Sequence, residues 1–138
     1  MDVQIRKIAW GAPKNIIAYH STKVGGWSGG VFESSNMSLD VGDNPKDVKK
    51  NRDSIIKQLH LKNTPVFMKQ IHSATVRVAK SPSDNLVCDS CYTNVKGLPL
   101  AVLSADCLPI LISSADGNKI GVIHAGWRGL ASGIIQKF

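Results

Sequence analysis

The sequence predicts a mixed α/β fold in a single domain that spans residues 1–138. Three observations lead to this prediction. Near-continuous apolar runs at residues 98–103 and 108–112 are typical of strands that are covered on both faces. An amphipathic helix is expected at residues 45–59. The length is that of one ordinary domain, which is enough chain to bury its own core.

The first part of the chain predicts two short strands and a long irregular loop. Residues 3–10 alternate apolar and polar side chains, residues 16–20 are mainly apolar, and a Gly-Ala-Pro turn separates them. The run that follows is STKVGGWSGGVFESSNMSLDVGDNP, whose glycines favour irregular backbone over a helix. A flexible linker is the alternative, but the run is too apolar for one. We therefore expect an ordered loop that lies over a site.

The helix at residues 45–59 has clear signals at its start. Asn44 is a good N-cap, Pro45 suits the first helical position, and Asp47 lies in the first turn, where the helix dipole favours negative charge. One face is apolar: Val48, Ile55, Ile56 and Leu59. The lysines on the other faces are expected to be solvated, with an anion-binding patch as the alternative.

Strands and a final helix are expected in the rest of the chain. Residues 76–79 alternate in polarity, which predicts a half-exposed antiparallel strand. An Asp-Gly-Asn turn predicts a hairpin that joins residues 108–112 to 120–123. From Arg128 onward a helix is expected with one apolar face: Leu130, Ile134, Ile135 and Phe138. It ends without capping signals, which indicates a fragment of a longer chain.

Composition narrows the class of protein. Hydrophobic residues make up 43% and charged residues 20%, as in a globular protein without disorder. No apolar run approaches the roughly 20 residues that span a bilayer, and the N-terminus does not resemble a signal peptide. A cytoplasmic protein with no membrane contact is expected. The net charge of +7 suits an anionic partner, but no basic run with interleaved aromatic residues predicts nucleic acid.

The cysteines predict thiols or metal ligands, since three cysteines without an export signal do not form a disulfide framework. Cys88 and Cys91 have the CxxC spacing of half a zinc site or of a redox pair. A second CxxC and a thioredoxin-like context are both missing. Two unrelated thiols is therefore the favoured interpretation.

His72, Cys107 and His124 are the candidate metal ligands, because each is expected where a strand ends and a loop begins. Two imidazoles and one thiolate suit zinc or copper, and they leave a fourth position open for water or substrate, as in a catalytic site. The alternative is a buried cysteine that packs as a small hydrophobe and histidines that are merely hydrogen-bonded. Asp106 either orients a ligand or ends a strand.

Two residues beside this group could bind a substrate. Arg128 opens the last expected helix, where its guanidinium and the backbone N–H groups could hold a phosphate. Trp127 offers a flat face for a ring, or else packs in the core.

The motifs occur in a distinctive order. Gln70-x-His72 precedes Asp89 and Thr93, and these are followed by SADCxP at residues 104–109 and HAGWRG at residues 124–129. The N-terminal half carries STKxGGxS from residue 21, then Asn36, VGD from residue 41 and VxxNR from residue 48. Together these motifs resemble the laccase-domain or YfiH-like family over essentially the whole chain.

The resemblance implies an α+β fold, a mixed-sheet layered sandwich of the YfiH-like type. It implies that His72, Cys107 and His124 are catalytic and hold zinc, with copper as the other metal. Lys23, Asn36 and Arg128 are the implied substrate-binding residues. Lys23 stands where the family usually has arginine, which keeps the charge but loses the bidentate fork. Family members continue well beyond HAGWRG, so the chain is expected to be the N-terminal portion of the family's full length, incomplete at its C-terminus.

The implied activity is that of a purine nucleoside phosphorylase. Adenosine, inosine, guanosine and S-methyl-5′-thioadenosine would react with phosphate to give the free base and the (methylthio)ribose 1-phosphate. Adenosine deamination would be a second activity, and the enzyme would be a monomer or a homodimer.

Two other functions remain as alternatives. The first is a copper-dependent polyphenol oxidoreductase. Multicopper oxidases need around ten histidine and cysteine ligands, whereas this chain has four histidines and three cysteines, seven in all. The second is an inactive, truncated binding module, which the open C-terminal helix supports.

Overall fold

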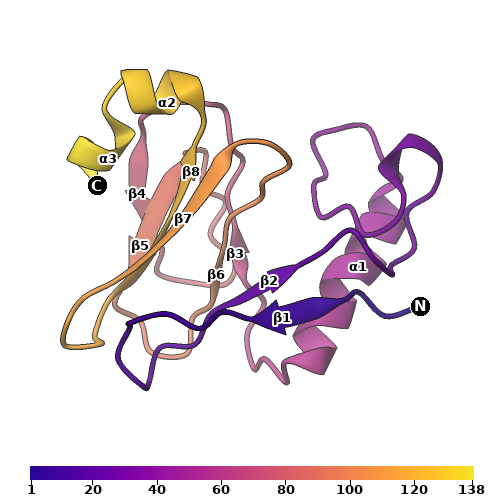
Figure 1. The fold of residues 1–138 in the computed structure, drawn as a ribbon, viewed down its shortest axis with the longest axis horizontal. Coiled ribbons are helices and arrows are strands. Elements are labelled where there is room, and N and C mark those ends of the chain that lie inside the picture. The colour runs from indigo at the N-terminus through magenta and orange to yellow at the C-terminus, as the bar shows by residue number, and fades with distance from the viewer. The chain divides into compact units, whose positions relative to one another are not determined.

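A computed structural model describes residues 1–138, which divide into two compact units. The first unit comprises Met1–Gly11 and Ile17–Lys62, and the second comprises Ala12–Ile16 and Asn63–Phe138. Each unit contains both helices and strands (Figure 1). The single domain over residues 1–138 stays a prediction. None of the helices has the length and apolarity that crossing a lipid bilayer requires.

The first unit contains one antiparallel strand pair and one long helix. Strands β1 (Ile5–Lys7) and β2 (Tyr19–Ser21) pair with each other. Both overlap the predicted strands but are shorter, and β2 ends one residue beyond the predicted range. The glycine-rich segment is irregular, as predicted, apart from one 3₁₀ turn, η1 (Gly30–Phe32). Helix α1 (Pro45–Gln58) follows it.

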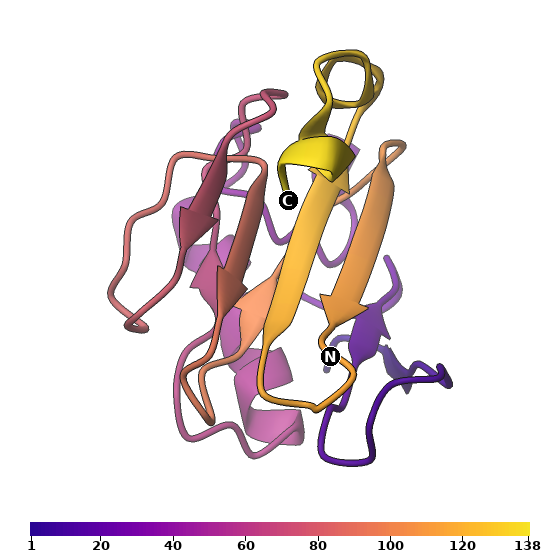
Figure 2. The same ribbon diagram turned by 90° about the vertical axis from the view of Figure 1, so that its left-hand side faces the viewer.

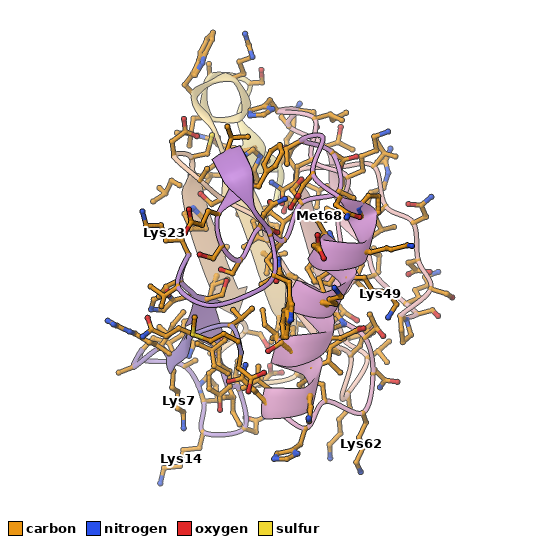
Figure 3. The ribbon with its side chains drawn as sticks, turned by 90° about the vertical axis from the view of Figure 1, so that its right-hand side faces the viewer. Lys7, Lys14, Lys23, Lys49, Lys62 and Met68 are labelled. Atoms are coloured by element: carbon orange, nitrogen blue, oxygen red, sulfur yellow. The ribbon has the colours of Figure 1, made fainter.

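Helix α1 begins as the sequence predicts. The Asn44 side chain accepts a hydrogen bond from the Lys46 N–H, and Pro45 occupies the first turn. Its exposed face carries lysines such as Lys49, whose side chain projects away from the helix (Figure 3).

The buried face of α1 differs from the prediction. Val48 is fully buried, but Ile55 and Ile56 are only half-buried, and polar Asn51 and Ser54 complete the face. These two side chains hydrogen-bond to segments distant in the sequence, which local periodicity does not report.

The second unit is built on a four-stranded sheet. Its strands lie side by side in Figure 2, in the order β4 (Val76–Val78), β5 (Ser90–Thr93), β8 (Ile120–Ala125) and β7 (Leu108–Ser113). A separate parallel pair consists of β3 (Val66–Phe67) and β6 (Leu100–Ala101). Parallel and antiparallel pairs both occur, as expected of a mixed sheet.

Three of the predicted strands need correction. Residues 98–103 form only the two-residue strand β6, which is half-buried and not covered on both faces. Strand β4 is parallel to β5, not antiparallel, because residues 79–89 bring the chain back to the same end of the sheet before β5 begins. Strand β7 is not covered on both faces. It lies at the edge of the sheet and its Leu108 is 57% exposed. An edge position tolerates Pro109, which has no N–H to donate.

The C-terminal region confirms the hairpin and corrects the helix. Strands β7 and β8 pair antiparallel across the Asp-Gly-Asn turn. The predicted single helix is instead two short helices, α2 (Trp127–Ala131) and α3 (Ile134–Lys137), because Gly133 has a left-handed φ of +79° that ends the first one. Ile134 is buried, whereas Leu130 and Ile135 are exposed, so the predicted continuous apolar face was wrong.

Candidate metal centre

The three predicted ligands converge within the second unit. The ligand atoms of His72, Cys107 and His124 all lie within 4.8 Å of one another. The Cys107 Sγ is 4.0 Å from the His72 Nε2. The two imidazole rings have centroids 4.9 Å apart and are nearly perpendicular, at 76°.

Strand pairing accounts for two of these positions. In the β7–β8 hairpin Leu108 lies opposite Ala125, so Cys107 and Gly126 meet just beyond the last pair. His124 lies inside β8 and Cys107 precedes β7, so neither follows a strand as predicted. His72 lies in the loop between β3 and β4. The sheet thus contains one candidate ligand, His124, the residue directly before β7 is the second, and a loop supplies the third.

Gly126 leaves the space that this convergence needs. A Cβ at this position would lie 3.2 Å from the Cys107 Sγ and 3.3 Å from the His72 Cδ2, both tighter than ordinary contact. A side chain here would push the thiol and the imidazole away. The first glycine of the HAGWRG motif, Gly126, therefore leaves room for both side chains at the site.

Asp89 orients His124. Its side chain is fully buried and its Oδ1 accepts a hydrogen bond from the His124 Nδ1 at 2.8 Å. A carboxylate can only accept, so Nδ1 carries the proton and Nε2 keeps its lone pair for a ligand. The Asp89 backbone carbonyl also accepts from the His124 N–H, at 2.7 Å.

The same carboxylate binds the loop that carries His72. It accepts hydrogen bonds from three consecutive backbone N–H groups, those of Ile71 at 3.1 Å, His72 at 2.9 Å and Ser73 at 2.7 Å. The Ser73 hydroxyl donates a further bond. His72 has a φ of +59°, which residues with a side chain seldom adopt.

The charges at the site favour a cation. Burial raises the pKa of Asp89, but hydrogen bonds from His124, Ser73 and Ile71 outweigh it and hold the pKa below 3.8, so the group is a carboxylate. Burial raises the pKa of the Cys107 thiol, and the carboxylates of Asp106 and Asp89 raise it further. A cation at this position would favour the thiolate over the thiol.

The donor set fits zinc. Two imidazole nitrogens and one sulfur are ligands that zinc prefers, and in a tetrahedral site they lie roughly 3.5 Å apart. The observed separations of up to 4.8 Å are close to that spacing, so small side-chain movements would complete it. His72 is exposed, Cys107 is half-buried and His124 is buried, so the group is open to solvent on one side.

The other cysteines lie apart from this group. Cys88 and Cys91 are free and fully buried, and they pack with Met68 and Val122. Burial raises the pKa of Cys91 to about 12 and also raises that of Cys88. Both thiols are protonated core residues, in agreement with the interpretation of two unrelated thiols.

Arg128 and Trp127 lie next to the ligands in the sequence and are exposed. The Arg128 guanidinium stacks over the Trp127 ring, 4.9 Å from its centroid. Trp127 is 72% exposed, which rules out a core role in this chain. The pair offers a flat, positively charged surface.

Lys23 and Asn36 belong to the first unit. The Lys23 side chain is exposed (Figure 3). Asn36 donates to the Ser38 carbonyl and to the Asp43 carboxylate, so its amide holds the loop together. Substrate binding by these two residues stays a prediction.

The sequence left open whether Asp106 orients a ligand or ends a strand, and it did not predict the orienting role of Asp89. Asp106 is exposed and acts on Cys107, whereas the carboxylate that binds a histidine ligand is that of Asp89. A signal was present, because an aspartate between the apolar Cys88 and Cys91 is expected to be buried and therefore paired.

Comparison with known protein families identifies the family of this chain. A family model described as multi-copper polyphenol oxidoreductase laccase matches residues 17–138. The chain belongs to this family. This result agrees with the laccase-domain or YfiH-like resemblance of the motifs.

The curated relatives of this chain are named differently from the family model. A purine nucleoside phosphorylase of Haemophilus influenzae is 41% identical over 128 residues, which cover 93% of this chain and 52% of that protein. Purine nucleoside phosphorylase YfiH of Escherichia coli is 36% identical over 129 residues, which cover 93% of this chain and 53% of that protein. The chain therefore spans about half the length of the curated relatives it matches.

Solved structures confirm the mixed α+β fold. A Neisseria meningitidis protein matches 96% of this chain and 55% of its own, with a TM-score of 0.85 and 36% identity. YlmD from Geobacillus stearothermophilus matches 83% of this chain and 46% of its own, with a TM-score of 0.77 and 37% identity. The layered, mixed-sheet fold class is that of these neighbours.

Proposed function

We propose that this protein is a metal-dependent purine nucleoside phosphorylase. The observation that carries the proposal is the convergence of His72, Cys107 and His124 at a solvent-accessible point in a chain whose relatives bear that name. The substrates would be adenosine, inosine, guanosine and S-methyl-5′-thioadenosine. Each would react with phosphate to give the free base and the (methylthio)ribose 1-phosphate.

The three ligands would hold zinc, with copper as the other candidate. Each has the atom that a metal needs: the Nε2 of His124 is turned away from Asp89, and the Cys107 Sγ and His72 Nε2 face each other. A bound zinc ion with an open position supplies Lewis acidity.

Phosphorolysis also requires positively charged side chains that bind the phosphate. Cleavage of an N-glycosidic bond passes through an oxocarbenium-like state, so the enzyme must hold phosphate near the anomeric carbon and stabilise the departing base. Arg128 would bind the phosphate, and its stacking on Trp127 sets the direction of the guanidinium. Lys23 would add a second cation, and Asn36 would contact the nucleoside.

Adenosine deamination would be a second activity of the same centre. Water would attack the adenine ring and ammonia would leave, and a metal with an open position would supply the Lewis acidity for this exchange. Three protein ligands leave such a position, which supports the proposal.

The decisive experiment follows adenosine in the presence and absence of phosphate. The purified chain is loaded with zinc, and adenine, ribose 1-phosphate and inosine are measured. Adenine that forms only with phosphate is the expected result. Inosine alone would show a deaminase, and the absence of any purine product would refute both activities for this chain.

A matched pair of variants ties activity to the centre. His72→Ala removes an exposed histidine of the group, and His20→Ala removes an exposed histidine of the first unit. Loss of adenine formation in the first variant only is expected. Equal activity in both variants would contradict the role of His72.

A copper-dependent polyphenol oxidoreductase is the second candidate, because the description of the matching family names that activity. Such enzymes need around ten histidine and cysteine ligands, and here three of the seven such residues converge. Cys88 and Cys91 are buried in the core. Oxidation of a phenol by the copper-loaded chain, abolished in His72→Ala, would favour this candidate.

A further inference from the structure

We propose that Asp89 is the positioning residue of the metal centre and that its single carboxylate sets both histidine ligands in place. The inference rests on the proposed metal site at His72, Cys107 and His124. It concerns a residue that touches neither the metal nor the substrate.

Asp89 holds His124 at two points. Its backbone carbonyl accepts from the His124 N–H at 2.7 Å, and its carboxylate accepts from the His124 Nδ1 at 2.8 Å. Both residues are buried, with exposed fractions of 0% and 4%. The ring is therefore fixed in orientation and in tautomer, with Nε2 available as the ligand atom.

Asp89 holds His72 through the backbone. The N–H groups of Ile71, His72 and Ser73 all point to the carboxylate, which makes a concave nest of amides around an anion. The nest includes the left-handed backbone of His72, at a φ of +59°, which needs such support in a residue with a side chain. The direction of the His72 side chain thus depends on the carboxylate.

If Asp89 had only a structural role, a folded Asp89→Asn chain would bind zinc as tightly as the wild type. A positioning role predicts weaker zinc binding in that folded variant. In Asp89→Asn, the one carbonyl oxygen of the amide would accept from the Oδ2 donors, the Ile71 and Ser73 N–H groups. The NH₂ group would then face the His124 Nδ1 and donate to it. The imidazole proton would move to Nε2, the atom that must ligate. Metal affinity would fall even in a folded chain.

Zinc affinity measured by chelator competition tests this. Asp89→Asn is expected to weaken zinc binding by about 10–100-fold. The control is Ser90→Ala, since Ser90 follows Asp89 directly, is equally buried, and its hydroxyl donates to the Val122 carbonyl, away from the site. The control is expected to bind zinc within twofold of the wild type, and chelator-treated samples of both variants are unfolded in urea to compare their folds.

The tautomer gives a second readout that needs no variant. In the metal-free wild-type chain, imidazole nitrogen NMR is expected to show His124 protonated at Nδ1 and unprotonated at Nε2. A neutral ring that carries its proton on Nε2 alone, and none on Nδ1, would overturn the proposal even if Asp89→Asn does not fold. In a folded Asp89→Asn chain, the proton is expected on Nε2.

The outcomes separate this inference from the metal site itself. Equal zinc affinity in the wild type and Asp89→Asn would overturn the role of Asp89 and leave the metal site standing. Failure of the wild type to bind one zinc ion would overturn the metal site, and the role of Asp89 with it. An equal loss of affinity in Ser90→Ala would show a general effect of strand β5 and would also overturn the positioning role.

Discussion

Replacing Gly126 by alanine tests the metal centre by adding one methyl group between two ligands. The new Cβ would lie 3.2 Å from the Cys107 Sγ and 3.3 Å from the His72 Cδ2, so each neighbour must move by a few tenths of an ångström. Metal–ligand distances tolerate about 0.2 Å. We therefore expect zinc affinity to fall about tenfold, which is about 1.4 kcal/mol of binding free energy.

The fold should tolerate this change. Gly126 has a φ of −73° and a ψ of 165°, which alanine adopts without strain. As the N-cap of α2 it has no side-chain hydrogen bond to lose, so the free energy of unfolding should drop by at most about 1 kcal/mol. Urea unfolding of the metal-free chain measures this change in the free energy of unfolding separately from metal binding.

Gly29→Ala is the matched control for the Gly126 substitution. Gly29 also precedes a short helix with extended backbone, at a φ of −124°, and a Cβ there meets nothing within 4 Å. Its zinc affinity, measured by chelator competition, should equal that of the wild type. Unchanged affinity in Gly126→Ala would refute the reasoning, because it would mean that Cys107 and His72 do not hold the same ion.

Three further predictions concern stability. Asn51→Ala leaves the Trp27 N–H and the Asn36 carbonyl without their partner, so urea unfolding should show a loss of about 2–4 kcal/mol, and a loss below about 1 kcal/mol would contradict it. Gly133→Ala places a side chain at a φ of +79° with room around it, so a loss of about 1–2 kcal/mol from backbone strain alone is expected in the same assay. The pKa of Asp89 is lowered from 3.8 in the folded chain, so its contribution to stability is present above pH 3.8 and is lost as the pH falls through the lowered value. The difference in unfolding free energy between the wild type and Asp89→Asn should therefore shrink on acidification, and a constant difference would contradict this assignment.

The sequence predicts helix starts and tight turns well, because their causes are local. The N-cap Asn44, the following proline and the turn of the β7–β8 hairpin were all recognisable within a few residues. The buried face of α1 was not, because Asn51 donates to the Asn36 carbonyl 15 residues away and Ser54 accepts from the Val3 N–H 51 residues away. Which polar side chains a helix buries depends on those distant segments.

Part of the candidate site could likewise be predicted from the sequence, and part could not. Residue type identified His72, Cys107 and His124, since thiol and imidazole are the side chains that zinc prefers. Their common position depends on strand register, which no local pattern reports. In β5 and β8, Ser90 lies opposite Ile123, and so Asp89 comes next to His124. Once that register is known, the orienting carboxylate follows.

The direction of β4 decides where His72 lies. Because β4 is parallel to β5, with Val76 opposite Ser90, the start of β4 is at the same end of the sheet as the start of β5 and the end of β8 (Figure 2). An antiparallel β4, as the alternation of residues 76–79 predicts, would start beside Thr93 instead. That end is three residues along the strand, roughly 10 Å away at ~3.3 Å per residue. The parallel pairing is therefore what brings the third ligand, and the amides that bind Asp89, to the site.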